Sequence, residues 1–305
     1  MNNPKISFKY LTEADYATIK PYFSLRPTMC CESHLAYHIL WSDYYKTQFY
    51  QHSDGLLWLQ QVDYDPVACL LPICEENKLC SMFTMLEDYY NNTLSQKVIM
   101  YLVDEAALNI LQPVLSKYQI LEDRDSFDYI YDADQLRNLV GRKYAKRKND
   151  ISFFLRNYEG RYEYRELTET NSTEILSFLN LWLEQKEDQD PLQRLKSEDT
   201  GLAHLLQALS LSNARIAGIY IDGILSAFSL GTYDPATKTV VIHVEKVLKV
   251  NRGLNPFLSQ QFLIRTFPEA NYVNREDDMG IPALRHAKEE YHPICFSKKY
   301  TLIQQ

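Results

Sequence analysis

The sequence contains few glycines and prolines, 9 and 12 among 305 residues, so no long low-complexity segment is expected. No stretch approaches the roughly 18 consecutive apolar residues of a membrane span, and the first residues, Met-Asn-Asn-Pro-Lys, contain no apolar signal core. The formal net charge of -8 gives the whole chain no attraction for nucleic acid or anionic membranes. We therefore expect a cytoplasmic globular protein that could bind phosphate-bearing partners only through a local basic patch.

Cysteine is also scarce, and its spacing is uninformative. The chain has six cysteines, Cys30, Cys31, Cys69, Cys74, Cys80 and Cys295. None of them forms a C-x-x-C pair or a zinc-binding spacing, so we expect buried thiols in a reducing compartment and no metal site. No activating partner stands near them in the sequence, which argues against a cysteine nucleophile.

Tyrosine and phenylalanine are abundant, with 23 and 13 residues, and most of them should lie in the core. Apolar patterning in the second half predicts a strand, two helices, a three-strand meander, a helix, a strand, a helix and a strand. The first strand is expected at 162–167, and the first helix starts at Thr170 or Ser172 and extends through Trp182. The remaining ranges are 191–211, 214–221, 224–232, 239–247, 254–266, 271–273, 281–289 and 294–302. The dipeptide Asp222-Gly223 is a strong hairpin signal between two of these strands.

This order of elements is typical of the GNAT acyltransferase fold. A weaker version of it precedes, with strands at 6–10, 55–62, 67–74 and 127–131 and helices at 12–23 and 92–111. We therefore predict an α/β (α+β) protein with two tandem GNAT-like mixed sheets flanked by helices. The expected domains are 1–158 and 159–305.

The segment 272–291 concentrates charge between a short strand and a proline-started helix. Asn274, Arg275 and Glu276 precede this helix, which carries Arg285, and Tyr291 follows it. Loops held between rigid elements often carry function, and an arginine here could bind a carboxylate or phosphate. The alternative is a solvated turn in which an aspartate caps the helix.

Two further clusters are candidates for chemistry. His243 and Glu245 alternate along one predicted strand and should therefore face the same way, with Lys246 opposite. A carboxylate beside an imidazole could deprotonate an attacking amine, although a satisfied buried pair is the alternative. The basic residues at 142–148 recur at helical spacing and favour a phosphate-bearing partner; they are Arg142, Lys143, Lys146, Arg147 and Lys148. Neutralisation by nearby acids is the competing interpretation of this run.

Segments 141–151, 242–246 and 272–285 together resemble a bacterial family, the phosphatidylglycerol lysyltransferase C-terminal-domain family, in its soluble stand-alone form. The resemblance implies a tandem GNAT fold and relatives that take aminoacyl groups from charged tRNA. In GNAT enzymes that use acetyl-CoA, a glycine-rich loop binds the pyrophosphate at a helix N-terminus. The corresponding residues here are Asn251, Arg252 and Gly253, with one glycine rather than two. Tyr291 stands where some GNAT enzymes place a general acid.

These observations predict an acyl- or aminoacyltransferase with Glu245, His243 and Tyr291 in catalysis. The expected donor is aminoacyl-tRNA or acyl-CoA, the acceptor a small molecule or lipid headgroup with an amine or hydroxyl, and no cofactor is tightly bound. The basic run, Lys246 and residues 251–253 would bind the donor, and residues 274–276 and 285 the substrate. The alternative is a non-catalytic GNAT-scaffold module that binds a phosphorylated ligand or RNA.

Overall fold

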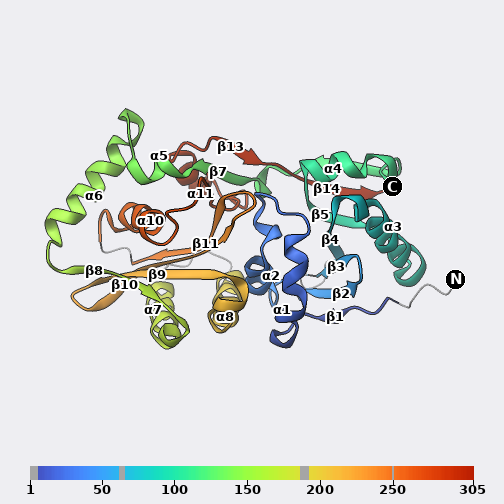
Figure 1. Cartoon of the computed structure of the whole chain (residues 1–305), viewed down its shortest axis with the longest axis horizontal. Coiled ribbons are helices and arrows are strands. Elements are labelled where there is room, and N and C mark those ends of the chain that lie inside the picture. The colour runs from blue at the N-terminus through green and yellow to red at the C-terminus, as the bar shows by residue number, and fades with distance from the viewer. Residues whose placement is uncertain (1–5, 62–65, 186–191, 249–250) are drawn as a thin grey trace.

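The computed structural model describes residues 6–61, 66–185, 192–248 and 251–305. They form two mixed seven-stranded sheets flanked by helices, one towards each end of the long axis of the molecule (Figure 1). The predicted α/β class with two tandem GNAT-like sheets is confirmed. Within the described ranges, no helix combines the length and apolarity needed to cross a bilayer.

The first sheet has the strand order β1-β2-β3-β4-β5-β14-β6. Its strands are β1 (Lys9–Tyr10), β2 (Gln48–His52), β3 (Gly55–Gln60), β4 (Ala68–Cys74), β5 (Ile99–Asp104), β6 (Tyr118–Glu122) and β14 (Lys299–Gln304). Its helices are α1 (Glu13–Ile19), α2 (Leu35–Trp41), α3 (Leu79–Tyr89) and α4 (Glu105–Leu111). This element order repeats that of the second half, as the tandem prediction requires.

The second sheet has the strand order β13-β7-β12-β11-β10-β9-β8. Its strands are β7 (Asp128–Asp132), β8 (Tyr162–Leu167), β9 (Ala214–Ile221), β10 (Ile224–Asp234), β11 (Thr239–Val247), β12 (Tyr272–Asn274) and β13 (Cys295–Ser297). Its helices are α5 (Ala133–Asn138), α6 (Ala145–Asn157), α7 (Ser172–Glu184), α8 (Leu192–Gln207), α9 (Leu209–Ser212), α10 (Leu254–Arg265) and α11 (Pro282–Glu289). Asp222 and Gly223 join β9 to β10 with φ of 51° and 81°, as expected for a type I′ hairpin.

The two halves share an apolar core. Tyr16 of α1 and Ile39 of α2 belong to the same buried cluster as Phe178 of α7 and Leu205 of α8. Two other cores serve one sheet each: α3 and α4 cover the first sheet, and α5, α6 and α10 cover the second. Burial of both helix pairs in one cluster joins the halves through the hydrophobic effect.

The halves also exchange strands. β7 precedes position 158 but pairs with β12 and β13 in the second sheet. β14 is the last strand of the chain but lies between β5 and β6 in the first sheet. The division into domains 1–158 and 159–305 therefore remains a prediction. Two strands, β7 and β14, belong to the sheet of the other half.

Two predicted elements differ from the structure. The helix predicted at 92–111 is wrong in its middle, because β5 occupies Ile99–Asp104 between a π-helical turn that ends at Leu94 and α4. Pairing of β5 with β4 and β14 outweighs the helical spacing of its apolar residues. The strand predicted at 294–302 is two strands, β13 and β14, and these belong to different sheets.

Candidate active site

A pocket opens where the parallel pairing of β11 with β12 ends, at Val241 and Asn274. It encloses about 380 Å³, part of which is open to solvent. Its walls come from β11, α5, α10 and the segment after β12. The lining includes Ile242, Glu245, Ser259, Arg275 and Tyr291. Ligands of open α/β sheets commonly bind beyond the carboxyl ends of strands, where neighbouring connections diverge.

Glu245 is held by three donors in this pocket. Its Oε1 accepts hydrogen bonds from Arg275 Nη2 at 2.9 Å and from Asn255 Nδ2 at 2.9 Å. Its Oε2 accepts from Ser259 Oγ at 2.7 Å. A carboxylate has about four acceptor positions, so Oε2 retains one for a ligand.

Tyr291 lies between two guanidinium groups. Arg147 and Arg275 stand over its ring at 4.4 and 4.7 Å from the centroid, as cation–π partners. Its hydroxyl is buried and donates to no acceptor among the described residues, although the Arg275 guanidinium interacts with it. Burial raises the pKa of Tyr291, and the charges of Arg275 and Arg147 oppose that rise.

The prediction that His243 and Glu245 face the same way is wrong. Leu230 pairs with Val244 whereas Gly231 pairs with Ile242, so His243 is the extra residue of a β-bulge. A bulge shifts the alternation of side chains by one residue. Glu245 therefore joins Ile242 in the pocket, while His243 contacts residues on the opposite side of the sheet.

His243 belongs to a buried chain of hydrogen bonds. Its Nδ1 lies 2.8 Å from Glu276 Oε1, and its Nε2 lies 2.8 Å from Thr232 Oγ1, which in turn lies 2.7 Å from His34 Nδ1. Burial lowers the pKa of both histidines to about 3, so both rings are neutral. Burial and the charge of Asp128 raise the pKa of Glu276 to about 8, against the opposing charge of Lys288.

The charged segment after β12 is fixed by its own contacts. Lys288 donates to the carbonyl oxygens of Arg275, Glu276 and Asp277. Arg285 donates to both carboxylate oxygens of Asp278, at 2.9 and 2.8 Å. These contacts give Arg285 a positioning role in the segment, and it does not line the pocket.

Asn274 has a similar place in the fold. Its Nδ2 donates to Asp128 Oδ2 at 2.8 Å and to the Met29 carbonyl oxygen at 2.6 Å. Its Oδ1 accepts from the backbone N–H of Glu276 at 2.6 Å. Asn274 thus ties the end of β12 to both halves of the protein and is fully buried.

Two of the five residues of the basic run are paired with an acid. Lys146 and Arg147 both contact Glu290, at 3.0 and 2.6 Å. Lys143 donates to Gln135 at 2.8 Å, while Arg142 and Lys148 are exposed. Lys246 pairs with Glu198 at 2.8 Å on the far side of the sheet from the pocket and does not share a surface with this run.

Residues 251–253, predicted to bind the acyl donor, also contact other parts of the protein. Positions 249–250 lie outside the described residues. Asn251 accepts a hydrogen bond from the Tyr158 hydroxyl at 2.7 Å, and Arg252 pairs with Asp150 at 3.0 Å. Gly253 has φ of 85°, and a Cβ there would lie 2.0 Å from the Asp150 carbonyl oxygen. The glycine is therefore required for the close approach of α10 to α6.

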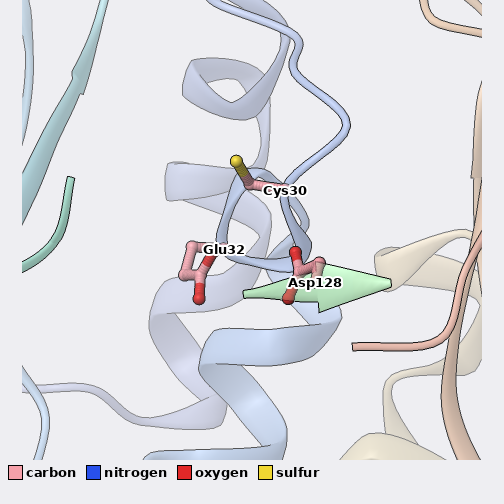
Figure 2. Close-up of side chains that lie close together, drawn as sticks. All are labelled: Cys30, Glu32 and Asp128. Carbon is pink, nitrogen blue, oxygen red and sulfur yellow. The ribbon is translucent and has the colours of Figure 1, made fainter. Parts of the chain in front are cut away.

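All six cysteines are free thiols, but the expectation that all are buried is only partly correct, because Cys80 is half-buried and Cys295 exposed. Cys30, Glu32 and Asp128 lie close together, with one sulfur or carboxylate oxygen of each within 4.8 Å of the others (Figure 2). The ammonium of Lys299 lies 2.6 Å from Glu32 and 2.7 Å from Asp128. It therefore supplies the positive charge for these carboxylates.

Glu245, Arg275 and Tyr291, which the sequence predicted as site residues, all line one pocket. The sequence did not indicate Asn255 and Ser259, which donate hydrogen bonds to Glu245. Both face it from the first turns of α10, and their spacing of four residues on a predicted helix was the available signal.

The duplicated sheet, with a pocket at the end of a parallel strand pair, defines a tandem GNAT-like protein. Residues 24–303 match the family described as phosphatidylglycerol lysyltransferase, C-terminal, and the chain belongs to this family. An uncharacterised protein of Mycoplasmoides gallisepticum is 24% identical over 194 residues. That match spans 62% of this chain and 60% of the length of the relative.

Two solved structures are similar over nearly the whole chain. A conserved protein of unknown function from Bacteroides thetaiotaomicron has a TM-score of 0.85 and 25% identity, covering 98% of this chain and 100% of its own. L-PGS of Bacillus licheniformis has a TM-score of 0.66 and 16% identity, covering 94% of this chain and 91% of its own. The second likeness shows the fold alone.

Proposed function

We propose that this protein is an acyl- or aminoacyltransferase that moves an activated acyl group from acyl-CoA or aminoacyl-tRNA to an amine or hydroxyl. Family membership supports transfer chemistry of this general kind, and the likeness to L-PGS supports the fold that it would use. The observation that carries the proposal is the pocket beyond β11 and β12, where Glu245, Arg275 and Tyr291 converge.

The chemistry we propose is direct attack. The acceptor nitrogen or oxygen forms a bond to the acyl carbonyl carbon, and the bond from that carbon to the leaving sulfur or oxygen breaks. The Tyr291 hydroxyl gives its proton to the leaving group, as its buried position and lack of a competing acceptor permit. Glu245 orients the acceptor through the free position on Oε2 and takes its proton, and positioning supplies much of the rate.

The phosphates of the acyl donor would lie along the basic run at 142–148. Arg142 and Lys148 are exposed, and Arg147 reaches from this face to the Tyr291 ring. Glu290 competes with an anion for Lys146 and Arg147. Anion binding is therefore expected to be weak and strongly dependent on salt, as for exposed charges in general.

The test measures transfer from labelled acyl-CoA and labelled aminoacyl-tRNA to a panel of amines and alcohols. Tyr291→Phe keeps the ring between the two arginines but removes the proton donor. We expect its turnover to fall roughly a hundredfold or more, the usual contribution of a general acid. Tyr300→Phe, in β14, is the control and should retain wild-type turnover. Wild-type turnover in Tyr291→Phe would contradict the assignment of this residue.

A second function has one specific observation in its favour. Glu245 is occupied by three donors, and Asn251 and Arg252 are also paired, which suits a rigid binding module. Such a module would be stabilised against heat by CoA or RNA without any transfer. The same assays distinguish the two, because only the enzyme forms an acylated product.

A further inference from the structure

A second pocket opens in the first sheet at the place that corresponds to the first pocket. The parallel pairing of β4 with β5 is formed by Cys69 with Met100 and Leu70 with Tyr101. The pocket lies just beyond this pairing and encloses about 490 Å³, part of it open to solvent. Its walls come from both strands, from the segment before α2 and from His38 of α2. The lining also includes Phe23, Arg26, Glu32, Leu70, Leu102 and Asp104.

One ion pair in this pocket is complete in itself. Both terminal nitrogens of Arg26 donate to the carboxylate of Asp104. Asp104 Oδ1 also accepts from the backbone N–H of Ala107 at 2.9 Å and so caps α4. This pair contributes no net charge to the pocket.

Glu32 of the lining belongs to a second cluster, which extends behind the pocket wall and does carry net charge. Glu32 and Asp128 share the single ammonium of Lys299, so two carboxylates face one cation (Figure 2 shows the two acids). Burial raises the pKa of the neighbouring Cys30 thiol to about 12, so this thiol is neutral. With both acids ionised, the cluster has a net charge of minus one in a buried setting, where an unbalanced charge is costly.

Two hydrogen-bond acceptors of the lining have no partner. His38 Nε2 lies 2.9 Å from the carbonyl oxygen of Glu32, so this nitrogen carries the ring proton and Nδ1 is an acceptor. Neither His38 Nδ1 nor Glu32 Oε2 has a hydrogen-bond partner among the described residues, and both atoms are buried. Buried acceptors without donors are unfavourable, so a ligand that supplies donors is favoured here.

We propose that this pocket binds a primary ammonium group, which donates to Glu32 Oε2 and His38 Nδ1. One positive charge balances the cluster, whereas a divalent ion would leave an excess beside Lys299. An ammonium group also carries three donors for the two free acceptors. Phe23, Leu70 and Leu102 in the same lining suit an alkyl chain on the ligand. This site is separate from the transferase pocket and stands whether or not transfer occurs there.

The test titrates the whole chain, labelled with ¹⁵N, with n-butylamine and follows the ring nitrogens of His38. We expect saturable binding that perturbs His38 and the indole of Trp58, which stacks on it at 4.4 Å. The alcohol 1-butanol lacks the charge, and tetramethylammonium lacks the donors, so both should bind at least about tenfold more weakly.

Glu32→Gln removes the negative charge but keeps the shape of the side chain. Its affinity for n-butylamine should fall at least about tenfold, whereas the exposed Glu76→Gln should bind as the wild type does. If Glu32→Gln does not fold, His38→Phe replaces it, because the ring can still stack on Trp58 while the acceptor is lost. Glu245→Gln should leave binding unchanged, which separates this test from that of the transferase pocket.

Binding should also depend on pH. The titratable groups that face Glu32 are Cys30, Cys31, Tyr37, Asp128 and Lys299. Burial raises the pKa of Glu32 to about 7 although Lys299 opposes the rise, so Glu32 gains its charge as pH increases through that value. A primary amine stays protonated throughout. Affinity should therefore increase from pH 6 to pH 8. Absence of saturable binding, equal affinity for 1-butanol, or wild-type affinity in both Glu32→Gln and His38→Phe would overturn the proposal.

Discussion

Glu245 and Arg275 form a buried ion pair that joins β11 to the segment after β12. Arg275 Nη2 lies 2.9 Å from Glu245 Oε1, and the two side chains are only 16% and 11% exposed. Burial of both charges costs solvation energy that their attraction offsets only while both are present. The pair therefore fixes the geometry of the pocket and makes each partner intolerant of loss of the other.

Arg275→Met should lower the free energy of unfolding by about 3 kcal/mol or more, because Glu245 is left buried without its cation. Adding Glu245→Gln to that variant should recover much of the loss. Urea unfolding of the wild type, both single variants and the double variant measures the coupling. The exposed pair of Arg161 and Asp222 is the control, and Arg161→Met should cost far less than Arg275→Met because solvent screens both charges. Strictly additive losses at the buried pair would contradict this account.

Thr232 lies between His34 and His243, and its single hydroxyl proton can satisfy only one of them. If the Thr232 hydroxyl donates to His34, its oxygen must accept a proton from His243 Nε2. His243 carries its proton on Nε2 when Glu276 is protonated and donates to His243 Nδ1. Ionisation of Glu276 reverses all three hydrogen bonds. We therefore expect both histidines to change tautomer together as Glu276 titrates.

Thr232→Val should uncouple the two histidines, because valine keeps the shape but cannot relay a proton. The ¹⁵N chemical shifts of the ring nitrogens measure the tautomers between pH 6 and pH 9. His243 should still respond to Glu276 in the variant, but His34 should not. Thr239→Val is the control, since the Thr239 hydroxyl donates only to the Thr237 carbonyl. A response of His34 that persists in Thr232→Val would refute the relay.

Stability should decrease as pH rises towards 8. Burial raises the pKa of Glu276 to about 8 in the folded protein, whereas an unfolded glutamate has a pKa of about 4.3. Between these values the folded state binds more protons than the unfolded state, so the free energy of unfolding falls with increasing pH. Urea midpoints at pH 7 and pH 8 measure the slope, because the buried histidines, which act in the opposite sense below about pH 6.5, are then largely neutral in both states. Glu276→Gln should make it shallower, and an unchanged slope would show that other groups cause it.

The residue patterns predicted the sheets better than they predicted the site. Alternation and turn residues locate β9, β10 and β11, because those signals are local. Strand exchange by β7 and β14 depends on pairing between residues far apart in the sequence, which local patterns do not contain.

The site shows the same limit. Glu245, Arg275 and Tyr291 were found because charged and aromatic residues cluster where strands end. The bulge at His243 could not be predicted, because it depends on the register of β11 with β10. Glu32 and His38 carry no motif, and only the fold brings them to a pocket.

Comparison of Gly253 with Gly223 separates the cost of backbone strain from the cost of a steric contact at a glycine. Both have positive φ, 85° and 81°, so alanine is strained at either position. A Cβ at Gly223 meets nothing within 4 Å, whereas one at Gly253 would lie 2.0 Å from the Asp150 carbonyl oxygen. Gly223→Ala should therefore cost about 1 to 2 kcal/mol, the usual penalty of a left-handed residue.

Gly253→Ala should cost clearly more than Gly223→Ala, because the start of α10 must also move away from α6. That movement should shift Ser259, which donates to Glu245, and so alter the transferase pocket. Urea unfolding gives the two stability losses, and amide chemical shifts along α10 report the displacement. Equal losses, with α10 unperturbed in both variants, would show that the contact with Asp150 is not limiting and that backbone strain alone sets the requirement for glycine.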